Sequence, residues 1–521
     1  MMPGTRCLFC SSTLRAVPVL FGLLILTACG ALPVKPRLAQ SLAEAGSNRG
    51  ELEQVLSHYR ELGEPLKIRA AEFLIANMSD KGFSLVRLAD ARGRVIPYDA
   101  TRYDSYQKAA SALNGLEQKY TGAKFRSLRF DADLATMKAD YLIRNIDLAF
   151  SAWRSKPWAK KVSFDTFLNY ILPYRGSNEP LDNWREPMLT RYAGVVSRLT
   201  EKKDMAAAAR LIEQDVRRQF QFKDLYYLHP TDQGFSEMES TGYGRCEDRS
   251  NMIGYGFKAN AIPSASDYTP YWADRDNNHQ WQVVLDENGR GHTDLSNRAA
   301  KVYRYTFALQ PDSLAYRLEK GESAPEWLGG KHALDVTDQY RVTSDVRVPL
   351  TVPVPEGQRF VYLTVFNGGR WKAVAWAEIK GHSAIFPKMG REIAYVPMYF
   401  INGALEPAAS AFILQADGNI QWLDGAHAEN KTISLAISAT TNQVKDADTE
   451  KTRARNRIKI GQEYGLVYWQ NGWQLIERKI ADQHALVFDQ VPANRLYWLV
   501  AEGSRQTDRI FTAQQGKITI W

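Results

Sequence analysis

The chain has 521 residues, of which 45% are hydrophobic and 24% are charged, and its formal net charge at pH 7 is +8. This composition is ordinary for globular protein and excludes a largely disordered chain. The length exceeds what one hydrophobic core holds, so at about 150 residues per domain we expect roughly three or four folded units. The densest basic run, from Lys451 to Lys459, alternates with other residues and indicates a solvated edge or linker. We therefore expect no nucleic-acid partner.

The N-terminal residues have the pattern of a bacterial targeting segment. An apolar run from Val17 to Leu26 follows Arg6 and Arg15 and is too short to span a membrane as a stable helix. The run ends in Leu26-Thr27-Ala28-Cys29-Gly30, which resembles the lipobox of bacterial lipoproteins. The alternative is an ordinary signal peptide that is cleaved near Ala28.

The lipobox resemblance implies how the N-terminus is organised. Residues 1–28 would be the signal peptide and residues 29–46 a lipidated tether, with Cys29 as the acylated residue. Acyl chains attach a protein firmly, because each buried methylene contributes about 0.8 kcal/mol. Gly30, in place of an aspartate, resembles the sorting pattern of outer-membrane lipoproteins. We therefore expect a lipid-anchored protein of the bacterial cell envelope, located in the outer membrane.

The cysteine count then singles out one thiol. Of the four cysteines, Cys7 and Cys10 would leave with the signal peptide and Cys29 would carry lipid, so Cys246 remains as the free thiol of the mature chain. In an oxidising compartment an unpaired cysteine is either buried and inert or kept for its chemistry.

Apolar stripes at helical spacing predict a helical domain over residues 47–200 and a further helix from Asp204. Within it, Pro65 stands at a first-turn position, and Asn145 lies on an apolar face where it needs a hydrogen-bond partner. The clearest stripes lie in residues 51–59, 66–74 and 131–153. The aromatic segment 164–185 is interpreted as a buried packing loop, with a substrate-cleft wall as the alternative.

Residues 201–330 form the next predicted unit. A helix is expected from Cys246 to Ala259, and Gly254 and Gly256 within it indicate a closely packed neighbour. Two strands are expected at 279–285 and 291–295, joined by a turn at 286–289.

From about residue 335 the pattern changes to strands and turns, and it repeats. Asn367-Gly368 and Asn471-Gly472 are the hairpin turns of two similar segments, which predict tandem β-sandwich-like modules at 335–425 and 458–521. Residues 426–457 are expected to be a linker or long loop. The tryptophans of these modules are expected to pack in a core, with sugar stacking as the alternative; they are Trp371, Trp469 and Trp473. The fold class predicted for the whole chain is multidomain α+β.

Three motifs in order carry a family resemblance. Gly244-Arg245-Cys246-Glu247-Asp248, then Ile262-Pro263, then His279-Gln280-Trp281 resemble the transglutaminase-like core of bacterial thiol enzymes, within the papain-like superfamily. Ala261 departs from the pattern, because the family has a glycine before its Ile-Pro turn. The resemblance covers roughly residues 195–305 and implies a transglutaminase-like α+β core.

The resemblance also implies site roles. Cys246 would be the nucleophile, His279 its base and Asp294 the acid, with Asn297 as the fallback for that position. The dipole at a helix start favours a thiolate, and N–H groups there can receive an oxyanion, so Gly244 and Arg245 are assigned to the oxyanion site or pocket. The remaining assignments are Trp281, which would dry the pocket, and Asp248, which would be a structural partner of the helix start.

Strand geometry does not decide which residue is the acid that orients His279. A two-residue turn at Asn288-Gly289 would pair Asp294 with Val283, which is about 13 Å along the strand from His279. Either the turn is wider, or another residue orients the imidazole.

Two functions follow. The first is an envelope-anchored cysteine hydrolase that cleaves an amide or peptide bond in a peptide, protein or cell-wall stem through an acyl-enzyme, with transamidation less favoured. The alternative is a non-catalytic binding or scaffolding lipoprotein whose β modules bind protein or glycan. We expect no cofactor, and no metal site, because the remaining histidines are scattered without metal-ligand spacing.

Overall fold

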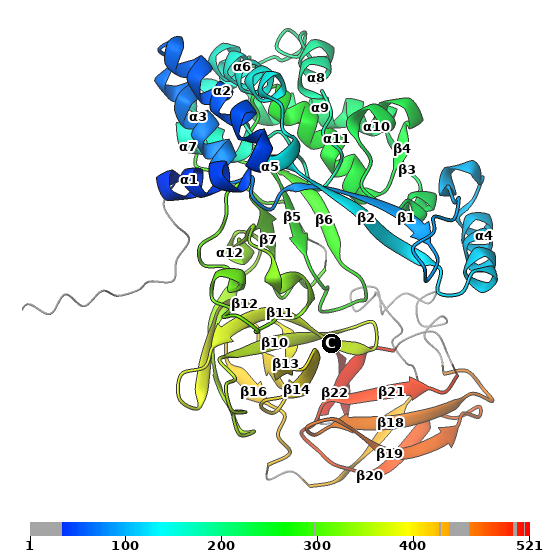
Figure 1. Cartoon of the computed structure of the whole chain (residues 1–521). Helices are drawn as coiled ribbons and strands as arrows, with labels where there is room; N and C mark the ends of the chain where they lie inside the picture. The colour runs from blue at the N-terminus through cyan, green and yellow to red at the C-terminus, as the bar shows by residue number, and fades with distance from the viewer. Residues whose placement is uncertain (1–33, 296, 427–428, 437–457, 504–507, 515) are drawn as a thin grey trace, which may run out of the picture.

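The computed structural model describes residues 34–295, 297–426, 429–436, 458–503, 508–514 and 516–521. The predicted signal peptide, the lipobox and Cys29 lie outside the described residues. Within these residues, every helix is too short or too polar to cross a membrane. The chain is an α+β protein with several sheets, in which helices gather at one end and β-sheets at the other (Figure 1).

The N-terminal half supplies most of the helices. They are α1 (Val34–Glu44), α2 (Arg49–Glu61), α3 (Pro65–Ala76), α4 (Tyr106–Lys119), α5 (Asp133–Thr136), α6 (Ala139–Ser155), α7 (Phe164–Tyr170), α8 (Arg185–Arg191), α9 (Met205–Gln219), α10 (Phe235–Thr241), α11 (Cys246–Ala259) and α12 (Thr337–Tyr340). The predicted tether is wrong over residues 34–44, because α1 packs Leu38 and Leu42 against the large helical core.

The predicted helical domain also contains a hairpin. β1 (Gly82–Ala89) pairs antiparallel with β2 (Lys124–Ala132), and α4 lies between them in the chain. The helix expected over 131–153 therefore begins later than predicted. Asp131 and Ala132 belong to β2, and α6 begins at Ala139 after the extended residue Lys138.

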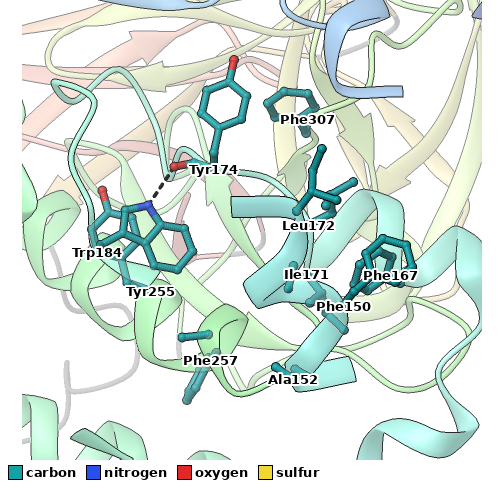
Figure 2. Packing of buried hydrophobic residues seen from close by; sticks show 14 of the residues in the cluster. Phe150, Ala152, Phe167, Ile171, Leu172, Tyr174, Trp184, Tyr255, Phe257 and Phe307 are labelled. Atoms are coloured by element: carbon teal, nitrogen blue, oxygen red, sulfur yellow. Dashed lines mark hydrogen bonds between the residues drawn. The ribbon is translucent and has the colours of Figure 1, made fainter. Parts of the chain in front are cut away.

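The predicted helix from Cys246 to Ala259 is confirmed as α11, and most of its residues are buried. Figure 2 shows Tyr255 of this helix beside Trp184, whose ring lies 4.6 Å away in a stacked arrangement and whose Nε1 donates to the carbonyl of Tyr174 at 2.8 Å. The glycines of α11 allow close neighbours. A Cβ on Gly256 would lie 2.7 Å from Ile212 of α9, and one on Gly254 would lie 3.3 Å from the Gln282 side chain.

The segment 164–185, interpreted as a buried packing loop, begins as helix α7, and most of residues 171–185 are buried. Asn178 and Asn183 are exposed, and residues 182–185 line a cavity of about 510 Å³, so the interpretation holds only in part. The fully buried Arg185 donates to Asn145 Oδ1 at 2.8 Å and to four backbone carbonyls, those of Ile171, Leu172, Pro173 and Lys258. Asn145 in turn donates to the Leu172 carbonyl at 3.0 Å, which satisfies the requirement inferred from its buried position. Burial lowers the pKa of Arg185 to about 9.

The sheet next to α11 has the order β6-β5-β7-β8, so β6 is an edge strand. Its strands are β5 (Ser264–Thr269), β6 (His279–Val284), β7 (Tyr303–Tyr305) and β8 (Ala333–Asp335). Two short parallel strands, β3 (Gln221–Phe222) and β4 (Tyr243–Gly244), precede α11. Ala261, where the family pattern has glycine, is buried with a φ of 52°, a left-handed conformation that glycine adopts without strain.

The second strand predicted for this region, 291–295, is wrong. The turn forms, with the N–H of Gly289 donating to the Asp286 carbonyl at 3.0 Å. After the turn, side chains replace a strand partner: Arg304 donates to the carbonyls of Gly289 at 2.8 Å and Gly291 at 3.0 Å, and Gln339 accepts from the N–H of Gly291 at 3.1 Å. The residues after Gly291 therefore continue as a loop.

Two β modules follow, and they share one strand order. β module 1 contains β9 (Thr343–Pro349), β10 (Phe360–Asn367), β11 (Arg370–Glu378), β12 (Ser383–Gly390), β13 (Ile393–Ile401), β14 (Ala404–Pro407), β15 (Phe412–Leu414) and β16 (Ile420–Trp422). β module 2 contains β17 (Lys431–Leu435), β18 (Glu463–Trp469), β19 (Trp473–Ile480), β20 (Leu486–Val491), β21 (Tyr497–Ala501), β22 (Ile510–Gln514) and β23 (Lys517–Ile520). The order β11-β10-β13-β15-β16 in the first module corresponds to β19-β18-β21-β22-β23 in the second.

Each β module adds a two-stranded sheet, β12-β9 in the first and β17-β20 in the second. The predicted linker 426–457 is therefore wrong over residues 431–435, because this segment pairs with β20 and buries Ile433 and Leu435 in the core of the second module. Residues 437–457 lie outside the described part of the chain.

The two modules meet at an aromatic cluster. Trp371 of β11 and Trp469 of β18 are 8% and 5% exposed, with ring centroids 5.3 Å apart, and Trp473 packs on both. These indoles form the core between the modules, so the favoured interpretation of core packing is confirmed for Trp371 and Trp469. In Figure 1 the C-terminal end of the chain lies at this junction, next to β10 and β22.

Candidate active site

A cavity of about 370 Å³ lies between α11, α9 and the free edge of β6. It is lined by Glu213, Arg217, Cys246, Arg249, Ser250, Ile253, Trp272, His279, Gln280, Trp281, Gln282, Thr293, Asp294, Leu295 and Asn297. Five residues predicted for the site thus line one cavity, including the fallback Asn297. Successive residues of β6 contribute, which is possible because an edge strand leaves one side uncovered.

Cys246 is the first residue of α11, and the carboxylate of Asp248, two residues later, fixes the start of the helix. The buried Asp248 accepts from the N–H of Arg245 at 3.0 Å and from the Gln233 backbone and side chain at 3.0 and 3.1 Å. Burial raises the pKa of Asp248. These bonds support the interpretation of Asp248 as a structural partner of the helix start.

Gly244 and Arg245 do not line the cavity, so the pocket role predicted for them is not found. Gly244 is buried on β4, where a Cβ would lie 2.6 Å from the Phe220 ring. The side chain of Arg245 pairs with Asp232 and lies 3.6 Å from Glu247. Both residues shape the approach to α11 because β4 ends directly before the helix begins.

Tyr227 is a site residue that the sequence did not reveal. It lies in the 3-10 helix Asp224–Leu228, and its hydroxyl is 3.5 Å from Cys246 Sγ. Burial, and then the hydrogen bond to Cys246, raise the pKa of Tyr227, so the phenol is protonated and able to donate at neutral pH. The aromatic run around Tyr227 has no spacing that marks one residue, and only the tertiary structure brings it to the thiol.

His279 is the first residue of β6 and is exposed to solvent. Its ring stacks between Trp272, with centroids 6.0 Å apart, and Trp281, at 5.3 Å. Although the side chain keeps contact with solvent, partial desolvation by the surrounding protein lowers the pKa of His279, and the positive charges of Arg249 and Arg275 lower it further. The imidazole is therefore neutral at pH 7, which is the form that accepts a proton.

Trp281, which stacks on the His279 ring, is itself fixed by hydrogen bonds. Its Nε1 donates to the Tyr340 hydroxyl at 3.1 Å, and that hydroxyl donates to Asp267 at 2.7 Å. Asp267 and Arg304 form a fully buried bidentate ion pair with both contacts at 2.8 Å. Since Arg304 also holds the turn after β6, one network fixes both the indole and the loop that carries Asp294.

The acid position differs from the family pattern. Asp294 lines the cavity from an exposed loop rather than from a strand, and Asn297 accepts a hydrogen bond from Arg275 through its side-chain oxygen. Among the described residues, no side chain makes a hydrogen bond to His279. The contacts of the imidazole in the described residues are with the rings of Trp272 and Trp281.

The described residues contain no cluster of three or more histidine, cysteine, aspartate or glutamate side chains that would hold a metal ion. The lining of the cavity includes a thiol, an imidazole and charged side chains, and the Tyr227 phenol lies 3.5 Å from the Cys246 sulfur.

Comparisons with known proteins give no functional assignment for this site. No family profile matches the sequence, and no curated protein is similar to it. Among solved structures, the chain aligns with a transglutaminase from red sea bream at 10% identity, over 72% of this chain and 74% of that chain, with a TM-score of 0.17. A score this low carries no argument about a shared fold. The functional argument therefore rests on the residues and geometry of the cavity.

Proposed function

We propose that this protein is a cysteine hydrolase that cleaves amide or peptide bonds through an acyl-enzyme at Cys246. The observation that carries the proposal is that Cys246, at the start of α11, and His279, at the start of β6, line one cavity. The motif resemblance to transglutaminase-like thiol enzymes points to the same two residues.

The proposed reaction has two halves. His279 takes the thiol proton as the sulfur attacks the carbonyl carbon of the amide, and the imidazolium then gives that proton to the departing amine. A thioester on Cys246 remains. Water attacks the thioester, with His279 again accepting a proton, and the carboxylic acid product leaves as the thiol reforms. Hydrolysis is favoured over transamidation because nothing in the sequence identifies a site for an amine acceptor.

Two donors near the sulfur can stabilise the oxyanion. The N–H of Cys246 belongs to the first turn of α11, where backbone N–H groups lack helical partners. As the first residue of α11, Cys246 has no residue four positions earlier in the helix to accept from its N–H. The Tyr227 hydroxyl, 3.5 Å from the sulfur, is the second donor.

The uncovered side of β6 favours an extended peptide as substrate. An edge strand presents unpaired N–H and C=O groups, and an extended chain can add to it as a further strand. Because this edge lines the cavity next to His279, main-chain pairing would bring a peptide amide to the thiol. A protein, a peptide or a cell-wall stem peptide has the required backbone.

We also propose that the protein acts in the bacterial envelope, anchored by lipid on Cys29 in the outer membrane. The lipobox-like residues Leu26-Thr27-Ala28-Cys29-Gly30 support this location. Palmitate labelling and membrane fractionation test it: the wild-type chain should carry label and sediment with the outer membrane, and Cys29→Ser should do neither. Equal labelling of both proteins would contradict the anchor.

A thiol-directed activity probe tests the catalytic proposal. The mature wild-type chain should be labelled at neutral pH, Cys246→Ala should not be labelled, and His279→Ala should be labelled at least about tenfold more slowly. Cleavage profiles of an envelope extract, wild type against Cys246→Ala, would then identify the substrate. If His279→Ala is labelled as fast as wild type, the thiol and imidazole do not act together. If wild type is not labelled, the non-catalytic binding lipoprotein becomes the better explanation.

A further inference from the structure

The loop that leads into His279, residues 270–278, is held from outside the catalytic core. Asn367, which ends β10 in β module 1, is 5% exposed and directs its side-chain amide into this loop. Three loop carbonyls accept from that amide: those of Trp272 at 3.0 Å, Arg275 at 3.0 Å and Asn277 at 2.9 Å. The next residue, Gly368, donates its N–H to Asp276 Oδ1 at 2.7 Å.

β module 2 contributes a second contact through Arg509, which is 3% exposed. Its guanidinium donates to the loop carbonyl of Ala273 at 2.5 Å, and it joins this loop to both modules through two further carbonyls, those of Phe366 at 2.9 Å and Trp521 at 2.9 Å. Burial lowers the pKa of Arg509 to about 10, so the group stays charged at neutral pH. A buried guanidinium with its donors committed to backbone carbonyls fixes these segments relative to one another.

The contacts converge on Trp272, whose ring stacks on the imidazole of His279. The loop closes on itself through the N–H of Trp272, which donates to the Asn277 carbonyl at 3.1 Å. On its other side, the N–H of Ala273 donates to the Arg298 carbonyl at 2.9 Å. The carbonyl that Asn367 holds thus belongs to the same residue whose indole faces the histidine.

We propose that Asn367 and Arg509 are positioning residues for His279, and that the two β modules are an integral part of the active site. This inference rests on the proposed function. Because no side chain among the described residues hydrogen-bonds the imidazole, the positions of Trp272 and Trp281 determine its orientation. A displacement of about 1 Å at a catalytic group can cost roughly 100-fold in rate, so a loop held at four carbonyls protects the geometry.

The test uses a matched pair of variants of the full mature chain. Asn367→Asp keeps the side-chain shape but removes both donor hydrogens and sets a carboxylate against three carbonyls. Asn471→Asp makes the same change at the corresponding turn of β module 2, where the residue is exposed. The measurements are the rate at which iodoacetamide alkylates Cys246 as a function of pH, the NMR titration of the His279 ring, and thermal unfolding.

We expect Asn367→Asp to lower the alkylation rate at neutral pH by about tenfold or more and to change the His279 titration, while Asn471→Asp stays within about twofold of wild type. The charged groups that act on the imidazole are Arg249 on α11 and Arg275 on the loop, and neither variant replaces them. Glu213, Arg217 and Asp294 line the same cavity and are also unchanged. A folded Asn367→Asp protein with wild-type alkylation and wild-type His279 titration would overturn the proposal.

A second variant keeps the test decisive if Asn367→Asp fails to fold. Asp276→Ala alters a half-buried loop residue, removes the acceptor of the Gly368 N–H, and should shift both readouts in the same direction. The two proposals also fail separately. If the wild-type thiol is alkylated no faster than a free cysteine, the catalytic function is wrong. The His279 titration in Asn367→Asp then still decides whether the modules position the ring.

Discussion

Partial burial lowers the pKa of His279 most, and the positive charges that flank its ring lower it further. Arg249 lies one turn after Cys246 on α11 and lines the same cavity, and its positive charge disfavours a second positive charge on the imidazole. Removing that charge in Arg249→Met should therefore raise the pKa of His279. Arg249→Lys, which keeps the charge, should leave it close to wild type. An NMR titration with His279→Gln for assignment measures both values, and a lower or unchanged pKa in Arg249→Met would refute this account.

Tyr227 tests whether the phenol acts on the reacting atoms. If its hydroxyl donates to the oxyanion, Tyr227→Phe should lower kcat by roughly 100-fold and change KM little, because the bond strengthens only in the transition state. Tyr243→Phe is the control, since this exposed tyrosine lies three residues before Cys246 and makes no hydrogen bond to the sulfur in the described structure. Steady-state kinetics on the substrate found by extract profiling separate the two effects. A rise in KM alone in Tyr227→Phe would assign Tyr227 to substrate binding.

At the scale of elements, Arg185 joins three helices. From the start of α8 it reaches the C-terminal ends of α7 and α11 and the middle of α6. Arg185→Met should lower the free energy of unfolding by about 3–5 kcal/mol, because buried acceptors lose their donor. Arg191→Met on the same helix removes a partly exposed pair with Glu239 and should cost less than about 1 kcal/mol. Denaturant titrations followed by circular dichroism measure the free energy of unfolding of both variants. Equal losses would show that the buried network of Arg185 stabilises the fold no more than the partly exposed pair does.

Local pattern was enough to predict the elements that carry Cys246 and His279. The helix from Cys246 to Ala259 is confirmed, as is the alternation along β6, where Trp281 and Val283 are buried and the intervening glutamines are less so. These elements are predictable because their apolar spacing and capping residues lie within a short stretch of chain.

Elements that depend on distant partners were missed. The strand expected at 291–295 is a loop because Arg304 and Gln339, from later in the chain, satisfy its backbone. The same limit applies to the site. Tyr227 reaches Cys246, and Asn367 reaches the loop before His279, only through tertiary contacts that no sequence spacing records.

At the scale of the whole molecule, the two β modules pack on each other and contact the loop before His279. The tryptophan cluster links the separate cores of the two modules. Arg509 of the second module donates a hydrogen bond to the carbonyl of Ala273 in the loop before His279. The shared strand order describes two copies of one architecture. The two copies differ in their surroundings: the hairpin turn of the first contacts the loop before His279, and the corresponding turn of the second is exposed.

The junction between the modules predicts energetic coupling between Trp371 and Trp469. Each Trp→Ala change should destabilise the β modules by about 3–5 kcal/mol, since a large buried ring is lost. In the double variant the losses should fall short of the sum by about 0.5–1.5 kcal/mol, because the edge-on pair at 5.3 Å is removed only once. Trp153 on α6 packs in the helical core, so Trp153→Ala combined with Trp469→Ala should be additive and serves as the control. Denaturant unfolding of the single and double variants measures the cycle. Full additivity of Trp371→Ala and Trp469→Ala would mean that the two modules unfold as separate units. It would also mean that the contact between them does not stabilise the hydrogen bonds of Asn367 and Arg509 to the loop before His279.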